Sequence, residues 1–352
     1  MRRLVLLLLL PFSWLYAGVM AVRNWLYDTG RRPVASFPEV AVVGVGNLRV
    51  GGTGKTPHVA WLVALLQELD QRPALLSRGY GRRTRGYRLA GPPDTAATIG
   101  DEPRQQYQQF QGQVPVAVCE DRAAGIRQLL RDAPATTAVI LDDAYQHRRV
   151  RPRFNILLTE QERPFYTDHV LPAGRLRESR HGAARADVII VTKCDPQLSA
   201  TAREAIARRI GRYAGPDVPV LFSGYEYGAP VPVGAAQVEA GAEVVLLTGI
   251  AQPTPLRRYL EQAGYRVVHH ARFPDHHAFT AAELAELAAL VGPGQSVFTT
   301  QKDAARLQDP ALMDQVKRLP LFYIPIHVRF LADGEARLRE LLTPTLKPHA
   351  VV

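Results

Sequence analysis

The stretch VGVGNLRVGGTGKTPHVAWL, from Val43 to Leu62, decides the fold of this chain. An apolar run ends in glycines, and Gly54-Lys55-Thr56 then opens a segment whose apolar residues recur at helical spacing. In this order of strand, loop and helix, the backbone N–H groups of the loop and the helix N-terminus both attract an anion. The stretch therefore predicts a phosphate-binding loop, with a glycine-rich hairpin before an ordinary helix as the alternative.

The loop residues have expected roles in binding a nucleoside triphosphate. Lys55 would reach the β- and γ-phosphates, and the hydroxyl of Thr56 would bind Mg²⁺. The expected nucleotide-binding residues are Gly51, Gly52, Thr53, Gly54, Lys55 and Thr56.

One residue departs from the usual pattern G-x-x-x-x-G-K-[ST]. Arg49 stands where the first glycine is expected, so Gly51 and Gly52 would have to supply the flexibility of the loop. The sequence leaves open whether the loop begins earlier, at Gly46.

Composition limits the class of protein. The chain has 352 residues, 47% of them apolar, which is enough for two domains with their own cores. The net charge of +10 favours anionic partners such as nucleic acid, an acidic membrane surface or a phosphorylated substrate. With only Cys119 and Cys194, a disulfide scaffold and a multi-thiolate zinc site are excluded.

The N-terminus is strongly apolar. Residues Leu4 to Val22 carry no charge, include Pro11, and are flanked by arginines on both sides. A cleaved signal peptide, a spanning anchor and a helix lying in the cytoplasmic leaflet are the alternatives. Because a loop that needs nucleotide follows within a few dozen residues, we expect residues 1–26 to form a membrane-associated helix that is retained and faces the cytoplasm.

Further apolar runs of strand length follow the loop, separated in part by helical patterns: PALLS, VPVAVC, TTAVILDD, FNILLT and DVIIVTK. Continuous apolar runs of this kind predict an α/β fold with a mainly parallel sheet covered by helices on both faces. Ligands bind at the carboxyl ends of such strands. We therefore expect a phosphate-loop NTPase-like core over residues 27–229.

A second, smaller α/β domain is expected over residues 230–345, after a Pro/Gly-rich linker at 229–234. Its expected elements are helices at Pro255–Ala263, Ala281–Leu290 and ARLRELL, and strands at Tyr265–His269, Ser296–Thr300 and LFYIPIHVRF.

Acidic residues stand at two expected element ends. Asp142 and Asp143 end an apolar strand, a pattern that holds Mg²⁺ opposite a phosphate loop, although a solvated strand end is the alternative. Asp101 precedes an expected helix start, which leaves a capping role and a catalytic role as the two alternatives.

Three other stretches carry possible chemistry. RFPDHHAF contains Asp275, His276 and His277, which suggest either a metal site or a histidine that orients a carboxylate in another domain. The stretch Arg78–Arg88 combines arginines and tyrosines and could contact RNA or the phosphates of a nucleotide or lipid. VTKCD, ending at Asp195, is similar to the T/N-K-x-D element with which many GTPases bind guanine.

Taken together, the motifs resemble the tetraacyldisaccharide 4'-kinase family of lipid A biosynthesis, from the N-terminal helix to Leu307. They occur in this order: VGNLRVGGTGKTP, SRGYGR, GDEP, LDDAYQHR, LPAGRLRE, VTKCD, FPDHHAF and TTQKDAARL. The resemblance implies ATP- and Mg²⁺-dependent phosphorylation of the 4'-hydroxyl of a tetraacylated glucosamine disaccharide 1-phosphate. It also implies a place on the cytoplasmic face of a bacterial inner membrane, with no nucleic acid and no obligate protein partner.

The resemblance also implies roles for individual residues. Asp101 would be the general base, with His276 as its partner, and Thr56, Asp142 and Asp143 would organise the metal. The residues expected to contact substrate or phosphate are Arg78, Arg122, His147, Arg177 and Glu178. The rival hypotheses are a regulatory or metallochaperone-type GTPase, suggested by VTKCD, and an RNA-binding module built on Arg78–Arg88.

Overall fold

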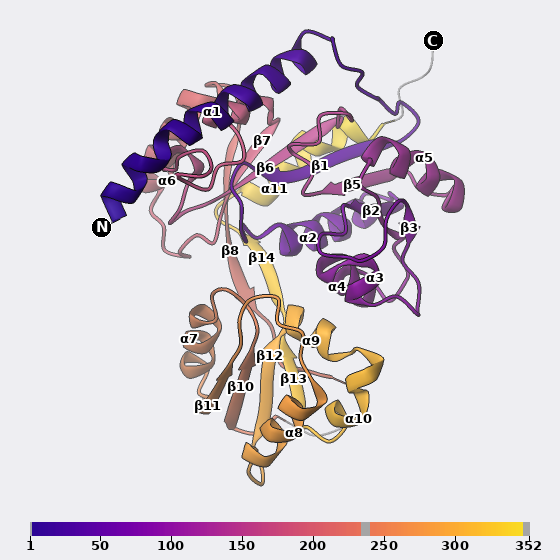
Figure 1. Ribbon diagram of the computed structural model, residues 1–352, viewed down its shortest axis with the longest axis vertical. Coiled ribbons are helices and arrows are strands. Elements are labelled where there is room, and N and C mark those ends of the chain that lie inside the picture. The colour runs from indigo at the N-terminus through magenta and orange to yellow at the C-terminus, as the bar shows by residue number, and fades with distance from the viewer. Residues whose placement is uncertain (1, 234–239, 348–352) are drawn as a thin grey trace.

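The computed structural model describes residues 2–233 and 240–347, which form two α/β units, each built around its own sheet (Figure 1). Two antiparallel strands, β8 (Val220–Tyr227) and β14 (Ile326–Phe330), run side by side between the units. The candidate functional residues are distributed over both units, so this connection determines how they meet.

The larger sheet has nine strands within the described residues. Their spatial order is β14, β8, β7 (Val188–Thr192), β6 (Phe154–Glu160), β1 (Ala41–Asn47), β5 (Ala138–Asp142), β2 (Pro73–Ser77), β4 (Val116–Val118) and β3 (Arg88–Leu89). The inner strands pair in parallel, and the edge pairs β3–β4 and β14–β8 are antiparallel. The predicted mainly parallel sheet is confirmed.

Helices cover both faces of this sheet because successive strand side chains point to opposite sides. The helices are α2 (Lys55–Glu68), α3 (Ala96–Ile99), α4 (Asp101–Gln109), α5 (Arg122–Asp132), α6 (Ala200–Ala214) and α11 (Gly334–Leu342), with 3₁₀ turns at Phe165–Thr167 and Arg180–Arg185. Val43 and Val45 of β1 belong to the core formed with α2 and α11, whereas Val42 belongs to the core formed with α5. On the same side as α5, α6 packs on β6 and β7. Both faces of β1 are therefore buried, which explains why its sequence is a continuous apolar run.

The smaller sheet has five strands in the described part of the chain. Their order is β11 (Arg266–Arg272), β10 (Glu243–Thr248), β12 (Ser296–Thr300), β13 (Leu321–Ile324) and β9 (Val231–Pro232). One face is covered by α7 (Thr254–Gln262) and the other by α8 (Ala281–Leu290), α9 (Gln301–Leu307) and α10 (Met313–Val316), with a 3₁₀ turn at Pro310–Leu312. The bounds of α8 and β12 are those predicted from the sequence.

The segment LFYIPIHVRF, predicted as one strand, is two strands that belong to different sheets. Pro325 separates β13 from β14, and a proline has no N–H group with which to continue a strand ladder. Consequently β14 and α11 return to the larger unit, although they lie inside the expected range 230–345 of the second domain. Residues 234–239, at the end of the expected linker and just beyond it, lie outside the described residues.

The N-terminal residues form one long helix, α1 (Arg2–Asp28), which continues through Pro11. A 3₁₀ turn at Thr343–Leu346 lies near the opposite end of the sequence. Polar groups of α1 bind the larger unit: Ser13 Oγ donates to the Val170 carbonyl at 2.9 Å, and the Tyr16 hydroxyl donates to the Arg177 carbonyl at 3.0 Å. Across the described residues, no helix combines the length and hydropathy that crossing a bilayer requires.

Candidate functional site

The predicted phosphate loop joins β1 to α2. Its backbone has positive φ at Gly51 (115°) and at Gly54 (88°), a region that residues with a Cβ rarely adopt. At Gly54 a Cβ would also overlap the hydroxyl of Tyr225 on β8. Gly46 lies inside β1 against Tyr145, so the glycine-rich turn begins after β1 and not at Gly46.

Buried hydrogen bonds hold this loop in place. Asn47 Nδ2 donates to Thr53 Oγ1 at 2.6 Å, and Thr192 Oγ1 donates to the Thr53 carbonyl at 2.8 Å. Burial lowers the pKa of His58 to about 4. The neutral ring therefore donates from Nδ1 to the Gly54 carbonyl at 2.8 Å and accepts at Nε2 from Ser223 Oγ at 2.9 Å.

Lys55 and Arg177 share one carboxylate. Lys55 Nζ lies 3.6 Å from Asp143 Oδ1, and the guanidinium of Arg177 binds both oxygens of Asp143, at 2.9 and 3.1 Å. Burial opposes ionisation of Asp143, but the two cations outweigh it, and the pKa of Asp143 lies below its ordinary value. The predicted phosphate-binding lysine is thus brought to the predicted metal-organising aspartate.

Asp142, the last residue of β5, lies in a different environment. Gln106 Nε2 donates to its Oδ2 at 3.2 Å, while its buried Oδ1 has no hydrogen-bond partner in the described structure. Burial raises the pKa of Asp142 to about 6, although Lys55 opposes the rise. A buried carboxylate oxygen without a donor, beside a phosphate loop, fits a cation such as Mg²⁺.

Arg122 and His147 meet beside Asp142. The buried guanidinium of Arg122 donates to the Cys119 carbonyl at 2.8 Å and to the Asp142 carbonyl at 3.4 Å. His147 Nε2 accepts from the backbone N–H of Arg122 at 3.2 Å, and burial, followed by the charge of Arg122, lowers the pKa of His147 to about 4. The exposed Arg78 follows β2 directly, and its charge adds to the burial that lowers the pKa of Arg122 to about 10.

Asp101 is the first residue of α4, and Gly100 occupies the N-cap position before it. The carboxylate of Asp101 is directed to the smaller unit, where it accepts from His276 Nδ1 at 2.8 Å and from Arg306 at 2.7 and 3.1 Å. Burial would raise the pKa of Asp101, but these hydrogen bonds and the charge of Arg306 hold it well below its usual range. Of the two alternatives for Asp101, capping is therefore the less supported.

The two neighbouring histidines of RFPDHHAF point to different partners. His276 has a positive φ of 62° and lies against Asp101, with Lys302 Nζ 3.3 Å from its Nε2. His277 Nε2 lies 3.0 Å from Glu283 Oε1, and its ring stacks on Phe273. No group of three or more His, Cys, Asp or Glu side chains suited to a metal is found among residues 2–233 and 240–347. The geometry favours the histidine that orients a carboxylate of another domain.

Glu178, expected to contact substrate or phosphate, is buried among protein groups. Its carboxylate accepts from Asn24 of α1 at 2.9 Å, from Gln146 at 2.9 Å and from Arg185 at 2.8 Å. In this structure it joins α1 to the larger unit.

The VTKCD element lies at the end of β7, beside the phosphate loop. Lys193 Nζ donates to the Gly52 carbonyl at 2.5 Å and forms an ion pair with Glu160. Asp195 accepts from the backbone of Gln197 at 2.8 Å. Lys193 therefore supports the phosphate loop.

Arg306 and Lys302 were missed as site residues by sequence reasoning, although both lie within the quoted motif TTQKDAARL. Lys302 Nζ lies 3.4 Å from Glu102, next to Asp101. Arg306 is held by Asp303, whose buried carboxylate also accepts from the Gly249 N–H. Two basic residues within this one motif were the available signal, but the residues that they contact, Asp101 and Glu102, lie in the other unit.

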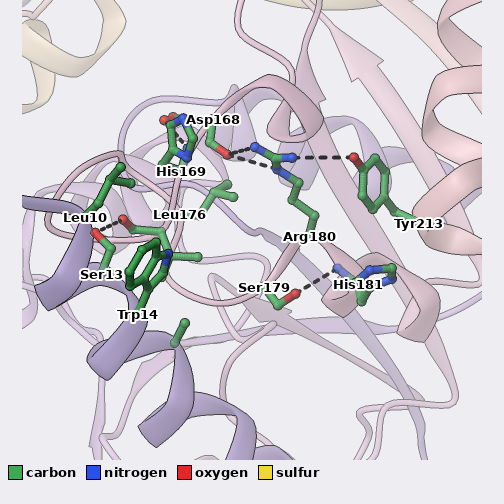
Figure 2. A pocket seen from close by; sticks show the side chains of 12 residues that line it. Leu10, Ser13, Trp14, Asp168, His169, Leu176, Ser179, Arg180, His181 and Tyr213 are labelled. Carbon is green, nitrogen blue, oxygen red and sulfur yellow. Dashed lines mark hydrogen bonds between the residues drawn. The ribbon is translucent and has the colours of Figure 1, made fainter. Parts of the chain in front are cut away.

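Two cavities lie apart from the candidate site residues described above. One, of about 380 Å³, lies between α1 and the segment that follows the Phe165–Thr167 turn, and is lined by Trp14, His169 and Arg180 among others (Figure 2). The other, of about 680 Å³, is lined by Tyr225 and Tyr227 of the connecting strand and by residues of α7, including Arg258.

Comparison with known proteins gives consistent similarities. A family model described as Tetraacyldisaccharide-1-P 4'-kinase matches residues 5–347. The tetraacyldisaccharide 4'-kinase of Cytophaga hutchinsonii is 42% identical over 342 residues, which cover 96% of this chain and 95% of that protein. The enzyme of the same name from Bacteroides thetaiotaomicron is 39% identical over 357 residues, covering 94% of this chain and 91% of that protein.

A solved structure is similar over the same length. The crystal structure of LpxK from Aquifex aeolicus in complex with ATP superposes with a TM-score of 0.74 at 28% identity, covering 96% of this chain and 98% of that chain. These similarities favour the kinase hypothesis over the GTPase alternative.

Proposed function

This chain belongs to the tetraacyldisaccharide-1-P 4'-kinase family, and we propose that it transfers the γ-phosphoryl group of ATP to the 4'-hydroxyl of a tetraacylated glucosamine disaccharide 1-phosphate. The observation that carries the proposal is the meeting of Asp101 with His276 and Arg306 of the other unit, in a chain that also holds a phosphate loop. One carboxylate that orients a hydroxyl, together with a loop that binds ATP, supplies what phosphoryl transfer needs, since positioning and charge neutralisation dominate this reaction.

On the donor side, the backbone of Gly51, Gly52, Thr53 and Gly54 would bind the phosphates of ATP, and Lys55 would contact the β- and γ-phosphates. Lys55 and Arg177 are paired with Asp143 in this structure, so bound phosphate would compete for both cations. Arg78 and Arg122 would add positive charge near the carboxyl ends of β2 and β4. The buried Arg122 is suited to an anionic ligand, because an anion would relieve the cost of burying its charge.

Mg²⁺ would be held by Asp142 and Thr56, with Asp143 nearby. The unpartnered Oδ1 of Asp142 supports this assignment. When bound, Mg²⁺ would supply positive charge that neutralises the charge developing on the transferred phosphoryl group.

On the acceptor side, Asp101 would accept a hydrogen bond from the 4'-hydroxyl and orient it toward the γ-phosphorus. Because His276 and Arg306 keep this carboxylate ionised, its main task is orientation, with little removal of the proton before phosphoryl transfer is under way. The proton would then be shared by the hydrogen-bonded Asp101–His276 pair.

The lipid substrate would be approached from a membrane surface on which α1 rests, at the cytoplasmic face of the bacterial inner membrane. An apolar row at alternating spacings of four and three residues is exposed on α1: Leu8, Phe12, Leu15, Val19 and Val22. Its members are 59 to 71% exposed, which is costly in water and favourable in a lipid interface. The net charge of +10 adds attraction to anionic lipids.

The test is a transfer assay on the purified, detergent-solubilised full chain. With γ-labelled ATP, Mg²⁺ and the disaccharide 1-phosphate acceptor, we expect one new phosphomonoester at the 4' position, identified by mass spectrometry of the product. Labelled GTP should be a poorer donor. Hydrolysis of nucleotide without a phosphorylated lipid, or a clear preference for GTP, would contradict the proposal.

A further inference from the structure

Arg49, the residue that departs from the phosphate-loop pattern, forms ion pairs with two carboxylates of the protein. Its Nε lies 2.7 Å from Asp168 Oδ2, and its Nη1 lies 3.3 Å from Glu160 Oε2. The side chain is only 13% exposed, and both carboxylates are mostly buried. The guanidinium is therefore engaged by two protein anions.

The backbone on either side of Arg49 is paired with the segment 168–177. Arg49 forms an antiparallel bridge with Leu176. The Val50 N–H donates to the Arg175 carbonyl at 2.8 Å, and the Arg177 N–H donates to the Leu48 carbonyl at 2.8 Å. The start of the phosphate loop is thus hydrogen-bonded to this segment through its backbone.

The same segment, residues 168–177, is hydrogen-bonded to α1. Ser13 Oγ donates to the Val170 carbonyl and accepts from the Ala173 N–H, both at 2.9 Å, and Tyr16 donates to the Arg177 carbonyl. The cavity of about 380 Å³ lies at this contact, and Figure 2 shows Ser13 and Trp14 of α1 facing the loop that contains Asp168 and His169. A lipid bound beside α1 would contact this segment.

Asp168 is the side-chain link between the segment and Arg49. Its Oδ1 accepts from the N–H groups of His169 and Arg175, while its Oδ2 binds Arg49. At the other end, Glu160 pairs with both Arg49 and Lys193, and Lys193 donates to the Gly52 carbonyl. Continuous charged contacts therefore run from the segment under α1 to the middle of the phosphate loop.

We propose that Arg49 is a positioning residue that couples binding of the lipid acceptor beside α1 to the conformation of the phosphate loop. Acceptor and ATP then bind with positive cooperativity, and each tightens the other by the same factor. This inference rests on the proposed function, because it takes the lipid as the acceptor.

The experiment measures the affinity for a non-hydrolysable ATP analogue, with Mg²⁺, in detergent micelles with and without the acceptor lipid. For the unchanged chain we expect the acceptor to tighten analogue binding about 5-fold or more, the lower end of ordinary coupling between sites. Arg49→Gln should reduce this factor to below about 2-fold, and Arg49→Lys, which can reach one carboxylate but cannot fork to both, should give an intermediate factor. Arg163→Gln, at an exposed arginine for which no ion pair is seen in the described residues, is the control and should keep the full factor.

A second variant, Asp168→Asn, tests the same contact if Arg49→Gln does not fold. Asp168→Asn keeps an oxygen for the His169 and Arg175 N–H groups but sets an amide against Arg49, so it should also lose the coupling. In steady-state assays both variants should raise the KM values for ATP and acceptor, with kcat at saturation within about 3-fold of the unchanged chain. A purely structural role would instead lower the amount of active enzyme and leave KM unchanged.

The outcomes distinguish a failure of the coupling through Arg49 from a failure of the proposed function. Folded Arg49→Gln or Asp168→Asn protein that retains the full coupling factor would overturn the inference, as would an unchanged chain that phosphorylates the lipid but shows no coupling. If the unchanged chain does not phosphorylate the lipid at all, the proposed function itself is wrong.

Discussion

Asp101 Oδ2 lies 2.8 Å from His276 Nδ1, although the two residues are 175 positions apart and belong to different α/β units. Arg306 donates to the same oxygen, so the smaller unit contributes both a ring nitrogen and a permanent cation to a carboxylate of the larger one. The placement of the two units relative to each other therefore determines the charge state of Asp101. The strands β8 and β14, which connect the units, hold that placement.

Replacing Arg306 should change the pH dependence of the reaction. Arg306→Gln removes a cation that lowers the pKa of Asp101 against the effect of burial, so this pKa should rise. Because the ionised carboxylate is the active form, the ratio of kcat/KM for Arg306→Gln to kcat/KM for the unchanged chain should fall toward the acid end of the profile. The Asp101–Arg306 pair also stabilises the fold at pH values above about 4, which is the pKa of an aspartate in the unfolded chain. This stabilisation is lost as the pH falls toward the lower pKa that Asp101 has in the folded protein.

The measurement is kcat/KM between pH 4.5 and 8, with Arg318→Gln, at an exposed arginine, as the control. A ratio to the unchanged chain that is equally low at every pH would show that Arg306 does not act through the ionisation of Asp101.

Asp142 should make the protein without nucleotide less stable at neutral pH. Burial raises its folded pKa to about 6, whereas an unfolded aspartate titrates near about 3.9. The folded state binds the extra proton between these values, so stability falls as the pH rises through that window and stays reduced above it. Asp142→Asn removes the titrating group and with it this loss of stability. The variant should therefore have a higher Tm than the unchanged chain at pH 7.5 without Mg²⁺ and ATP.

The same variant should lose phosphoryl transfer, because it removes a proposed Mg²⁺ ligand. Thermal melts at pH 5 and pH 7.5 test the stability claim, since the difference between the two proteins should shrink at pH 5. A variant that melts below the unchanged chain at pH 7.5 would mean that Asp142 stabilises the fold, in disagreement with its buried, unpartnered Oδ1.

Gly54 should tolerate alanine poorly for two separable reasons. Its φ of 88° costs a residue with a Cβ about 1–2 kcal/mol, and the added carbon overlaps the Tyr225 hydroxyl. Gly54→Ala should therefore lower the free energy of unfolding by more than the backbone cost alone, and adding Tyr225→Phe should restore part of the loss. Urea denaturation measures both.

Tyr80→Phe, at a tyrosine that is 80% exposed, is the matched control in the Gly54→Ala background and should restore nothing. Equal stabilities with Tyr225→Phe and with Tyr80→Phe would show that the overlap does not matter.

The exposed row on α1 should determine binding to lipid. Phe12→Glu with Leu15→Glu places two charges on a face where each apolar side chain is worth about 1.5–3 kcal/mol when buried. Co-sedimentation with vesicles that contain anionic lipid should fall more than about 10-fold. Leu290→Glu, on the exposed surface of α8, should bind vesicles like the unchanged chain. Equal losses in both variants would point to charge alone.

Local pattern was sufficient to predict much of the fold. The apolar runs of β1, β5, β6 and β7 are buried on both faces, so they carry a continuous signal, and the loop before Lys55 is defined by glycines whose backbone requires them. The split at Pro325 was missed because both halves of that run are apolar and only pairing with two different sheets separates them.

The site was also predicted only in part, because some of its contacts join residues that lie far apart in the sequence. The Asp142–Asp143 pair follows a strand and was visible locally, whereas the contacts of Asp101 with Arg306 depend on how two units pack. The contacts of Glu178 could not be predicted from the sequence, because its partners Asn24 and Arg185 come from distant elements. Arg49 departs from the loop pattern, and its ion pairs with Glu160 and Asp168 depend on contacts between residues more than 100 positions apart.

The most direct test of the central claim compares Asp101→Asn with Asp314→Asn, a control at an exposed aspartate of α10, in two assays on the same preparations. One measures transfer of the γ-phosphoryl group to the lipid acceptor, and the other measures binding of the ATP analogue. We predict that Asp101→Asn transfers phosphate at least about 100-fold more slowly while binding the analogue as tightly as the control. Transfer at the control rate, or loss of analogue binding together with transfer, would contradict the assignment of Asp101 to the acceptor.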